Sequence, residues 1–140
     1  MANIVELRNM SNEKLEEMLE NAREEMFNLR FQHAATRLEN TVRIKDVRRE
    51  FAQVKTVLGQ RQQVIAEASS HPEIAKALDG KEWTGTANYV YEDESWAVAF
   101  DSDGKNVASA KVNLNVKKPR TRRQRNAAGA VRQVTSYEVN

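Results

Sequence analysis

Apolar side chains recur with helical spacing in the first part of the chain. Between residues 15 and 33 they trace one face of a helix at about 100° per residue, and neither Gly nor Pro interrupts them. Ser11 stands before this stretch as an N-cap residue, and Glu13 lies in the first turn, where a carboxylate favours the helix dipole. The pattern predicts a helix from Ser11 to about residue 35.

A second periodic stretch, residues 43–58, is apolar on one arc and basic on the other. Its apolar residues are Ile44, Val47, Phe51, Val54 and Leu58. The predicted helix continues past Gly59 to about Glu67. Because residues 35–40 leave only a short connection, the two helices are expected to form an antiparallel hairpin.

The pattern changes after Pro72. Residues 72–78 predict a short helix that Asp79 and Gly80 end. Residues 86–91, 95–100 and 107–116 are rich in Val, Tyr, Trp and Phe with partial alternation, and turn-forming residues separate them. They predict a small antiparallel β-hairpin or three-stranded meander. The basic tail that follows has no apolar periodicity and is expected to be extended or disordered without a partner.

These patterns predict a mainly α fold class: an antiparallel two-helix hairpin followed by a small β extension and a basic tail. The expected division of the chain is a helical domain at 1–68, a linker with a short helix at 69–80, a β extension at 81–116 and the tail at 117–140.

Charge is distributed unevenly, although the net charge is only +2. Residues 13–25 are mainly acidic, residues 30–61 are mainly basic, and residues 117–132 carry basic side chains without an acidic one. Segregation of this kind indicates a protein that contacts a polyanion at chosen places.

Several kinds of site are excluded or disfavoured by composition. The chain has no cysteine, so disulfides and thiolate metal sites are excluded. Its two histidines lie far apart without a supporting ligand set, and residues 101–104 lack the spacing of a calcium loop. No phosphate-binding loop or nucleophile motif is present. We therefore expect no enzyme activity, no cofactor and no metal. Without a signal peptide or an apolar span, a cytoplasmic protein with no membrane contact is expected.

Four segments resemble the bacterial large-subunit ribosomal protein L-twenty-nine family. They are Asn28–Gln32, Leu38–Thr41, Arg43–Arg49 and Ala52–Thr56, and the resemblance covers about residues 4–65. It implies a helical hairpin, present once per ribosome, that binds large-subunit ribosomal RNA near the polypeptide exit tunnel. It also implies ribosomal protein L-twenty-three as a neighbour, with exit-site chaperones or targeting factors docking close by.

The resemblance and the charge pattern together give the predicted RNA-binding residues. Those that the resemblance carries over are Arg30, Gln32, Asn40, Thr41, Arg48, Arg49, Lys55 and Thr56. Those that charge adds are Arg43, Lys45, Lys117, Lys118, Arg120, Arg122, Arg123 and Arg125.

Alternatives remain open at this point. The apolar arcs of the two helices also suit a coiled-coil interaction module, such as a homodimeric adaptor. The family does not cover residues 66–140, which fit either a surface addition with an extra RNA anchor or a protein–protein contact module. Phe27 and Phe31 lie away from the main seam and either cover its edge or contact a partner.

Overall fold

The computed structural model describes residues 3–37, 39–116, 120–126 and 133–140. The chain folds into two compact units, Met1–Gln60 and Arg61–Asn140. Helix α3, Val42–Ser69, contributes residues to both units.

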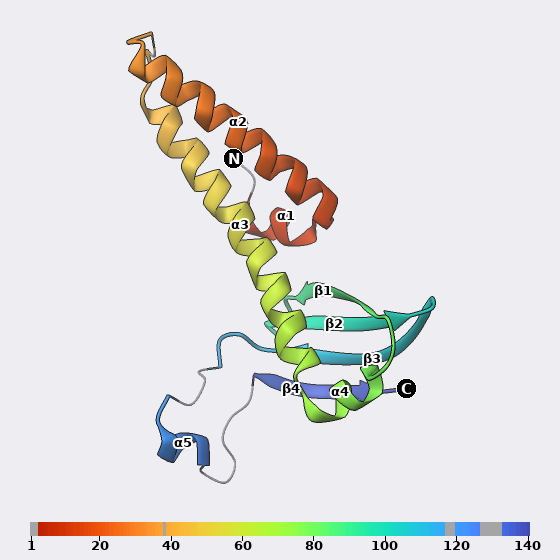
Figure 1. The fold of residues 1–140 in the computed structure, drawn as a ribbon. Helices are drawn as coiled ribbons and strands as arrows, with labels where there is room; N and C mark the ends of the chain where they lie inside the picture. Colours follow the sequence, from red (N-terminus) through yellow and green to blue (C-terminus); the bar gives the residue numbers. More distant parts are fainter. Residues whose placement is uncertain (1–2, 38, 117–119, 127–132) are drawn as a thin grey trace. The chain divides into compact units, whose positions relative to one another are not determined.

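The first unit is helical. Helix α2, Asn12–Ala34, and the first part of α3 lie side by side in opposite directions (Figure 1). Both long helices were predicted, and Ser11 is confirmed as the N-cap of α2, because its hydroxyl accepts a hydrogen bond from the Lys14 backbone N–H at 3.3 Å. The short helix α1, Ile4–Asn9, was not predicted. It adds a third element to the hairpin.

The hairpin core is one seam of small and branched side chains, divided into two clusters. One cluster contains Leu7, Leu15, Val54 and Val57, and the other contains Ala22, Leu29 and Val47. Leu7 is 1% exposed, so α1 closes one end of the seam. Since these residues are buried within a single chain, they are not available as the surface of a coiled-coil dimer, and the structure gives the adaptor alternative no support.

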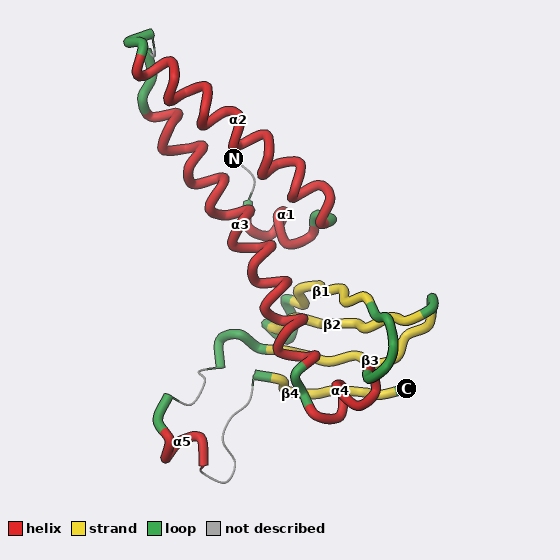
Figure 2. Tube along the Cα trace, viewed as in Figure 1, coloured by secondary structure: helices red, strands yellow, loops and turns green. Residues whose placement is uncertain are grey.

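The second unit combines a four-stranded antiparallel sheet with helices. Its strands are β1, Thr84–Val90, β2, Ser95–Ser102, β3, Lys105–Val112, and β4, Val134–Val139, in the order β1-β2-β3-β4. The last part of α3 and helix α4, Pro72–Leu78, pack on the sheet (Figure 2). The core between these layers includes Val64, Ile74, Trp96, Val98 and Phe100.

The predicted turn at the end of β2 is confirmed. Asp103 and Gly104 connect β2 to β3, with φ of 52° and 77°. A two-residue turn with positive φ at both positions has the twist that antiparallel strands need, and Asp-Gly is a preferred sequence for it.

Two expectations for the C-terminal part are corrected. The sheet has four strands rather than two or three, and its third strand ends at Val112 instead of Val116. In the tail, Val134–Val139 is extended as expected but pairs along β3 as a fourth strand, and Arg122–Asn126 forms the short helix α5 instead of an extended segment. Strand β4 is only six residues long and depends on a partner far away in the sequence. Its own pattern is too short to reveal it.

Two glycines should respond in opposite ways to replacement by alanine. A Cβ on Gly85 would lie 2.8 Å from Cγ2 of Ile65, so Gly85→Ala should destabilise the second unit by about 1–3 kcal/mol through overpacking. A Cβ on Gly59, inside α3, would meet nothing within 4 Å, so Gly59→Ala should add about 1 kcal/mol of helix stability. Chemical denaturation of both variants tests this. Equal effects of the same sign would contradict the Gly85–Ile65 contact.

Candidate nucleic-acid interface

The predicted RNA-binding side chains lie on the protein surface. Each of them that the structure describes is exposed, whereas Lys117 and Lys118 lie outside the described residues. Because they are exposed, the arginines and lysines of this set can contact phosphates. The antiparallel arrangement of α2 and α3 decides which of them share a surface.

One side of the helical hairpin brings cations from both helices around an aromatic ring. Arg23 of α2 and Lys55 of α3 lie over the ring of Phe51, at 6.0 Å and 5.8 Å from its centroid. Seven residues is nearly two full helical turns, or about 10 Å, so Arg30 and Arg48 occupy the same side of their helices as Arg23 and Lys55 respectively. We call Arg23, Arg30, Arg48 and Lys55, with Phe51 between them, the cationic flank.

The remaining predicted residues of α3 do not belong to this flank. Lys45, Arg49 and Thr56 lie roughly opposite the buried seam, since they are displaced by about half a turn from Val47. Within the part of the chain that the structure describes, Lys45 and Arg49 form no ion pair. The Thr56 hydroxyl donates a hydrogen bond to the Ala52 carbonyl at 2.7 Å.

Two residues predicted to contact RNA, Asn40 and Arg43, already form hydrogen bonds within the protein. The Asn40 side-chain oxygen accepts a hydrogen bond from the Val42 N–H at 3.0 Å, which satisfies a backbone donor at the start of α3. Arg43 Nε donates to Glu25 Oε1 at 2.7 Å and joins α3 to α2. This hydrogen bond and the Glu25 charge raise the pKa of Arg43. Glu25 thereby neutralises part of the charge that Arg43 offers to an anion. Gln32 and Thr41 are exposed near the ends of their helices.

Sequence reasoning missed Arg23. It counted this residue within the acidic stretch 13–25, and only the pairing of α2 with α3 places it beside Phe51 and Lys55. Arg23 also donates to Glu20 at 2.7 Å, in a pair whose side chains are 58% and 62% exposed. A pair this exposed to water contributes little to stability. The arginine can therefore exchange Glu20 for another anion at small cost.

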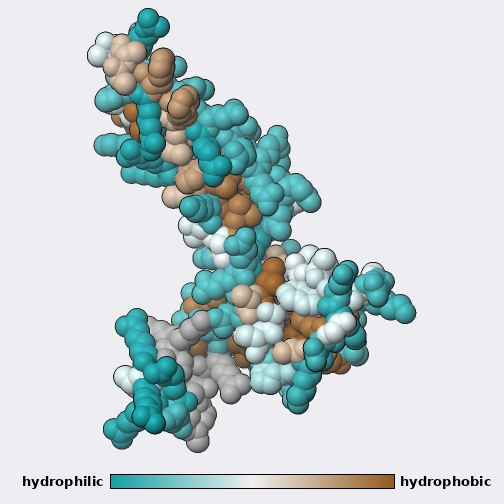
Figure 3. Space-filling model, viewed as in Figure 1, coloured by the Kyte–Doolittle hydropathy of each residue, from teal (hydrophilic) through white to brown (hydrophobic). Residues whose placement is uncertain are grey.

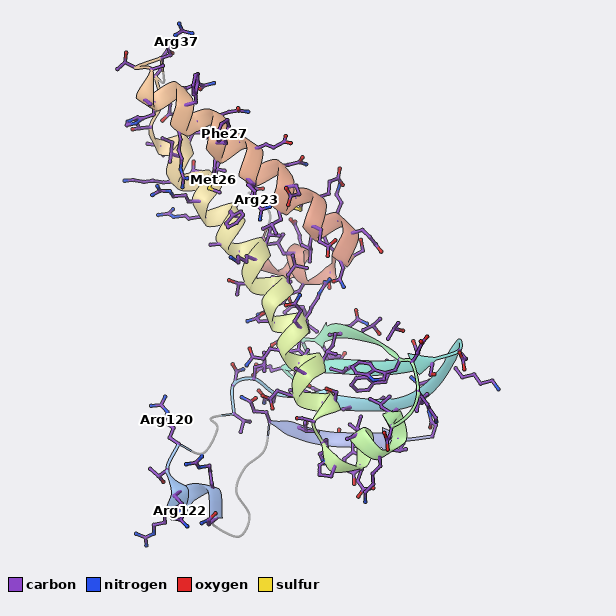
Figure 4. All side chains as sticks on the ribbon, in the orientation of Figure 1. Arg23, Met26, Phe27, Arg37, Arg120 and Arg122 are labelled. Atoms are coloured by element: carbon purple, nitrogen blue, oxygen red, sulfur yellow. The ribbon has the colours of Figure 1, made fainter. Side chains whose placement is uncertain are left out.

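The described part of the basic tail carries a separate group of arginines. Arg122, Arg123 and Arg125 belong to α5 and Arg120 precedes it, and all four are exposed. Figure 4 labels Arg120 and Arg122. They belong to the second unit, whereas the cationic flank belongs to the first. The two groups of cations therefore belong to different units of the chain.

The described residues contain no group of three or more His, Cys, Asp or Glu side chains that is placed to hold a metal ion. Among the helices in the described ranges, none is both long and apolar enough to cross a membrane.

On the face drawn in Figure 3, hydrophobic side chains form a stripe along the helical unit with hydrophilic ones beside it.

Comparison with known proteins identifies the family of the helical unit. The family described as "Ribosomal L29 protein" matches residues 5–61. The large ribosomal subunit protein uL29 of Magnetococcus marinus is 55% identical over 56 residues, which cover 40% of this chain and 84% of the relative. The chain belongs to the uL29 family. It is thus a structural, non-enzymatic component of the large ribosomal subunit and is located with the ribosome in the cytoplasm.

Other uL29 proteins match with similar coverage. The relative from Natranaerobius thermophilus is 49% identical over 57 residues, 41% of this chain and 88% of its own length. The relative from Mycobacterium ulcerans is 44% identical over 77 residues, 55% of this chain and 89% of its own length. No solved structure matches the chain.

The family match extends from residue 5 to residue 61, so it contains α1 except Ile4, all of α2, the first 20 residues of α3 and the complete cationic flank. The sheet, α4 and α5 all lie after residue 61 and form an extension to the uL29 part.

Proposed function

We propose that the helical unit of this uL29 protein binds large-subunit ribosomal RNA through its cationic flank, close to the polypeptide exit tunnel. The observation that carries the proposal is the convergence of Arg23 and Lys55, one from each helix, on the ring of Phe51. The family places the chain in the large ribosomal subunit, where ribosomal RNA is the abundant polyanion.

The proposed mechanism is phosphate neutralisation by a preformed surface. Lysine and arginine that contact phosphates release condensed counterions, so affinity requires neither catalytic geometry nor reading of a sequence. A-form RNA suits such a surface because proteins recognise it largely by shape and backbone. Buried Leu15, Ala22 and Val54 hold the two helices in register, so the cations are positioned before binding.

We also propose a role for each part of the chain. Residues 1–68 would serve as the ribosomal-protein domain, with ribosomal protein L-twenty-three and exit-site chaperones or targeting factors as neighbours. Residues 69–80 would link this domain to the extension at 81–116, and the basic segment from residue 117 would add a second RNA contact through the exposed arginines of α5. The second candidate for the extension is a protein–protein contact module. The exposed outer strand β4, which pairs with β3 on one side, favours that candidate.

The double variant Arg48→Ala/Lys55→Ala should bind large-subunit ribosomal RNA more weakly and with a smaller dependence on salt. Loss of two phosphate contacts should reduce the slope of log affinity against log salt by about 1–2. The measurement is filter binding of the full chain to purified ribosomal RNA across a series of salt concentrations. The matched control is Lys14→Ala/Lys76→Ala, which also removes two exposed cations, at 59% and 78% side-chain exposure, neither of which belongs to the flank.

Equal slopes for the two double variants would contradict a localised interface on the flank.

The same assay tests the extension when four arginines are replaced together by glutamine, namely Arg120, Arg122, Arg123 and Arg125. Substitution is preferable to deletion of residues 117–140, since deletion would also remove β4 from the sheet. An unchanged slope would exclude the second RNA contact.

A further inference from the structure

Two phenylalanines on α2 leave most of their surface in water. Phe27 is 71% exposed and Phe31 is 70% exposed, although every other phenylalanine of the chain is partly or fully buried. The two residues are one helical turn apart, have the same chemistry and have nearly the same exposure. Their surroundings differ, and this difference indicates what Phe27 binds.

Phe27 lies beside the cationic flank. It follows Arg23 by one turn, and the two side chains line a shallow depression of about 350 Å³ together with Glu24 and Asn28. Figure 4 labels Arg23, Met26 and Phe27 along α2. Phe31 does not line this depression, because it lies two turns from Arg23 and about 80° around the helix, whereas Phe27 lies one turn and about 40° away. Of the two exposed phenylalanines, Phe27 is therefore the one that shares a depression with a flank cation.

The charged side chains near Phe27 (Arg23 and Glu24 in the depression, and Glu20 paired with Arg23) favour a polar partner over an apolar protein surface, and the guanidinium of Arg23 favours a nucleotide. Arg23, which lines the depression, also lies over Phe51 together with Lys55, so two cations stand on the same side of the hairpin as Phe27. A protein that covered Phe27 with apolar side chains would have to desolvate Arg23 as well. A nucleotide offers a flat base for the ring and a phosphate for the guanidinium at the same time.

We propose that Phe27 stacks on an unpaired base of large-subunit ribosomal RNA while Arg23 contacts the adjoining phosphate. The base is unpaired because a continuous A-form helix hides its base faces, whereas loops, bulges and ends expose them to aromatic side chains. The proposal rests on the proposed RNA-binding function and assigns one residue to one nucleotide contact within it.

Binding of full-length variants to purified large-subunit ribosomal RNA tests the stacking contact. Phe27→Ala should weaken binding by about 5- to 100-fold, which is the usual effect of losing one base–aromatic stack. Phe27→Tyr, which keeps the aromatic face, should bind within about threefold of the parent chain, and Phe27→Leu should remain weak. The matched control Phe31→Ala should change binding by less than about twofold. Equal losses at the two positions, or full activity of Phe27→Leu, would overturn the proposal.

Crosslinking separates RNA from protein as the occupant. A photoreactive phenylalanine analogue at position 27, in ribosomes purified from cells that make this variant, should give a crosslinked product that ribonuclease shortens. A crosslinked product that ribonuclease leaves unchanged, and that contains peptides of a second protein, would overturn the proposal in favour of a protein partner.

Failure of the stacking contact and failure of the proposed function are distinguishable. If Phe27→Ala binds like the parent chain while Arg48→Ala/Lys55→Ala binds weakly, stacking is wrong and phosphate binding by the flank stands. If the parent chain itself shows no affinity for ribosomal RNA, both are wrong. Circular dichroism of each variant verifies that the helices are intact, and retained helicity is expected because position 27 is exposed.

Discussion

Replacing Phe100 by alanine should lower the free energy of unfolding of the second unit by about 3–5 kcal/mol. Phe100 is 0% exposed on β2 and is among the largest fully buried side chains of the described chain. Its ring meets Trp83 edge to face with centroids 5.2 Å apart. The substitution therefore creates a cavity and also removes a favourable aromatic pair.

Tryptophan fluorescence during chemical denaturation measures this effect selectively, since both tryptophans, Trp83 and Trp96, belong to the second unit. The control is Phe31→Ala, which removes the same side chain from a position that is 70% exposed and should change stability by less than about 0.5 kcal/mol. An unfolding midpoint that stays unchanged in Phe100→Ala would show that the core around this ring is not packed as described.

Leu15→Ala should cost the helical unit about 2–5 kcal/mol. Leu15 is 0% exposed and packs with Leu7, Val54 and Val57, so it joins α1, α2 and α3. A unit of this size has little stability to spare. We therefore expect the variant to lose much of its helix content when it is free in solution.

Far-UV circular dichroism at increasing denaturant concentration follows the helices and measures this loss. Val42→Ala serves as control, because Val42 is 58% exposed at the start of α3 and contributes nothing to the seam. If Leu15→Ala and Val42→Ala shift the ellipticity transition equally, the role of Leu15 as the contact of three helices is refuted.

The long helices could be predicted because each carries its signal within a continuous stretch. Periodic apolar residues and the Ser11 cap define α2 without reference to any other part of the chain. Helix α1 could not be predicted, since six residues contain fewer than two turns. Its Leu7 is recognisable as a core residue only when α2 and α3 are already in place.

The strands show the same distinction between local and distant information. The β2–β3 turn is encoded by Asp103 and Gly104 alone. Strand β4, in contrast, has mostly exposed residues and gains its structure from hydrogen bonds to β3. The polar residues of β4 follow a basic segment, so the sequence there predicts an unpaired tail. The residues of β4 alone do not reveal that β3 is their pairing partner.

The candidate site was predictable by residue type but not by grouping. A helical wheel of α3 separates Lys55 from Val54, yet it says nothing about which residues of α2 lie beside Lys55. Antiparallel pairing supplies Arg23 from a stretch that is acidic overall, and it assigns Arg43 to Glu25. The charge pattern of the sequence therefore predicts which residue types would meet a polyanion, whereas the fold decides which of these residues share a surface.

The pairing of β4 with β3 turns the basic segment into a closed loop. The Asn113 N–H donates to the Gln133 carbonyl at 2.8 Å, so the two ends of residues 113–133 are held together by the sheet. A chain with both ends fixed has fewer conformations than a free tail, and it loses less entropy when a partner orders it. Strand β4 thereby connects Arg120 and the arginines of α5 to the sheet from both sides of the sequence, although it carries no basic side chain itself.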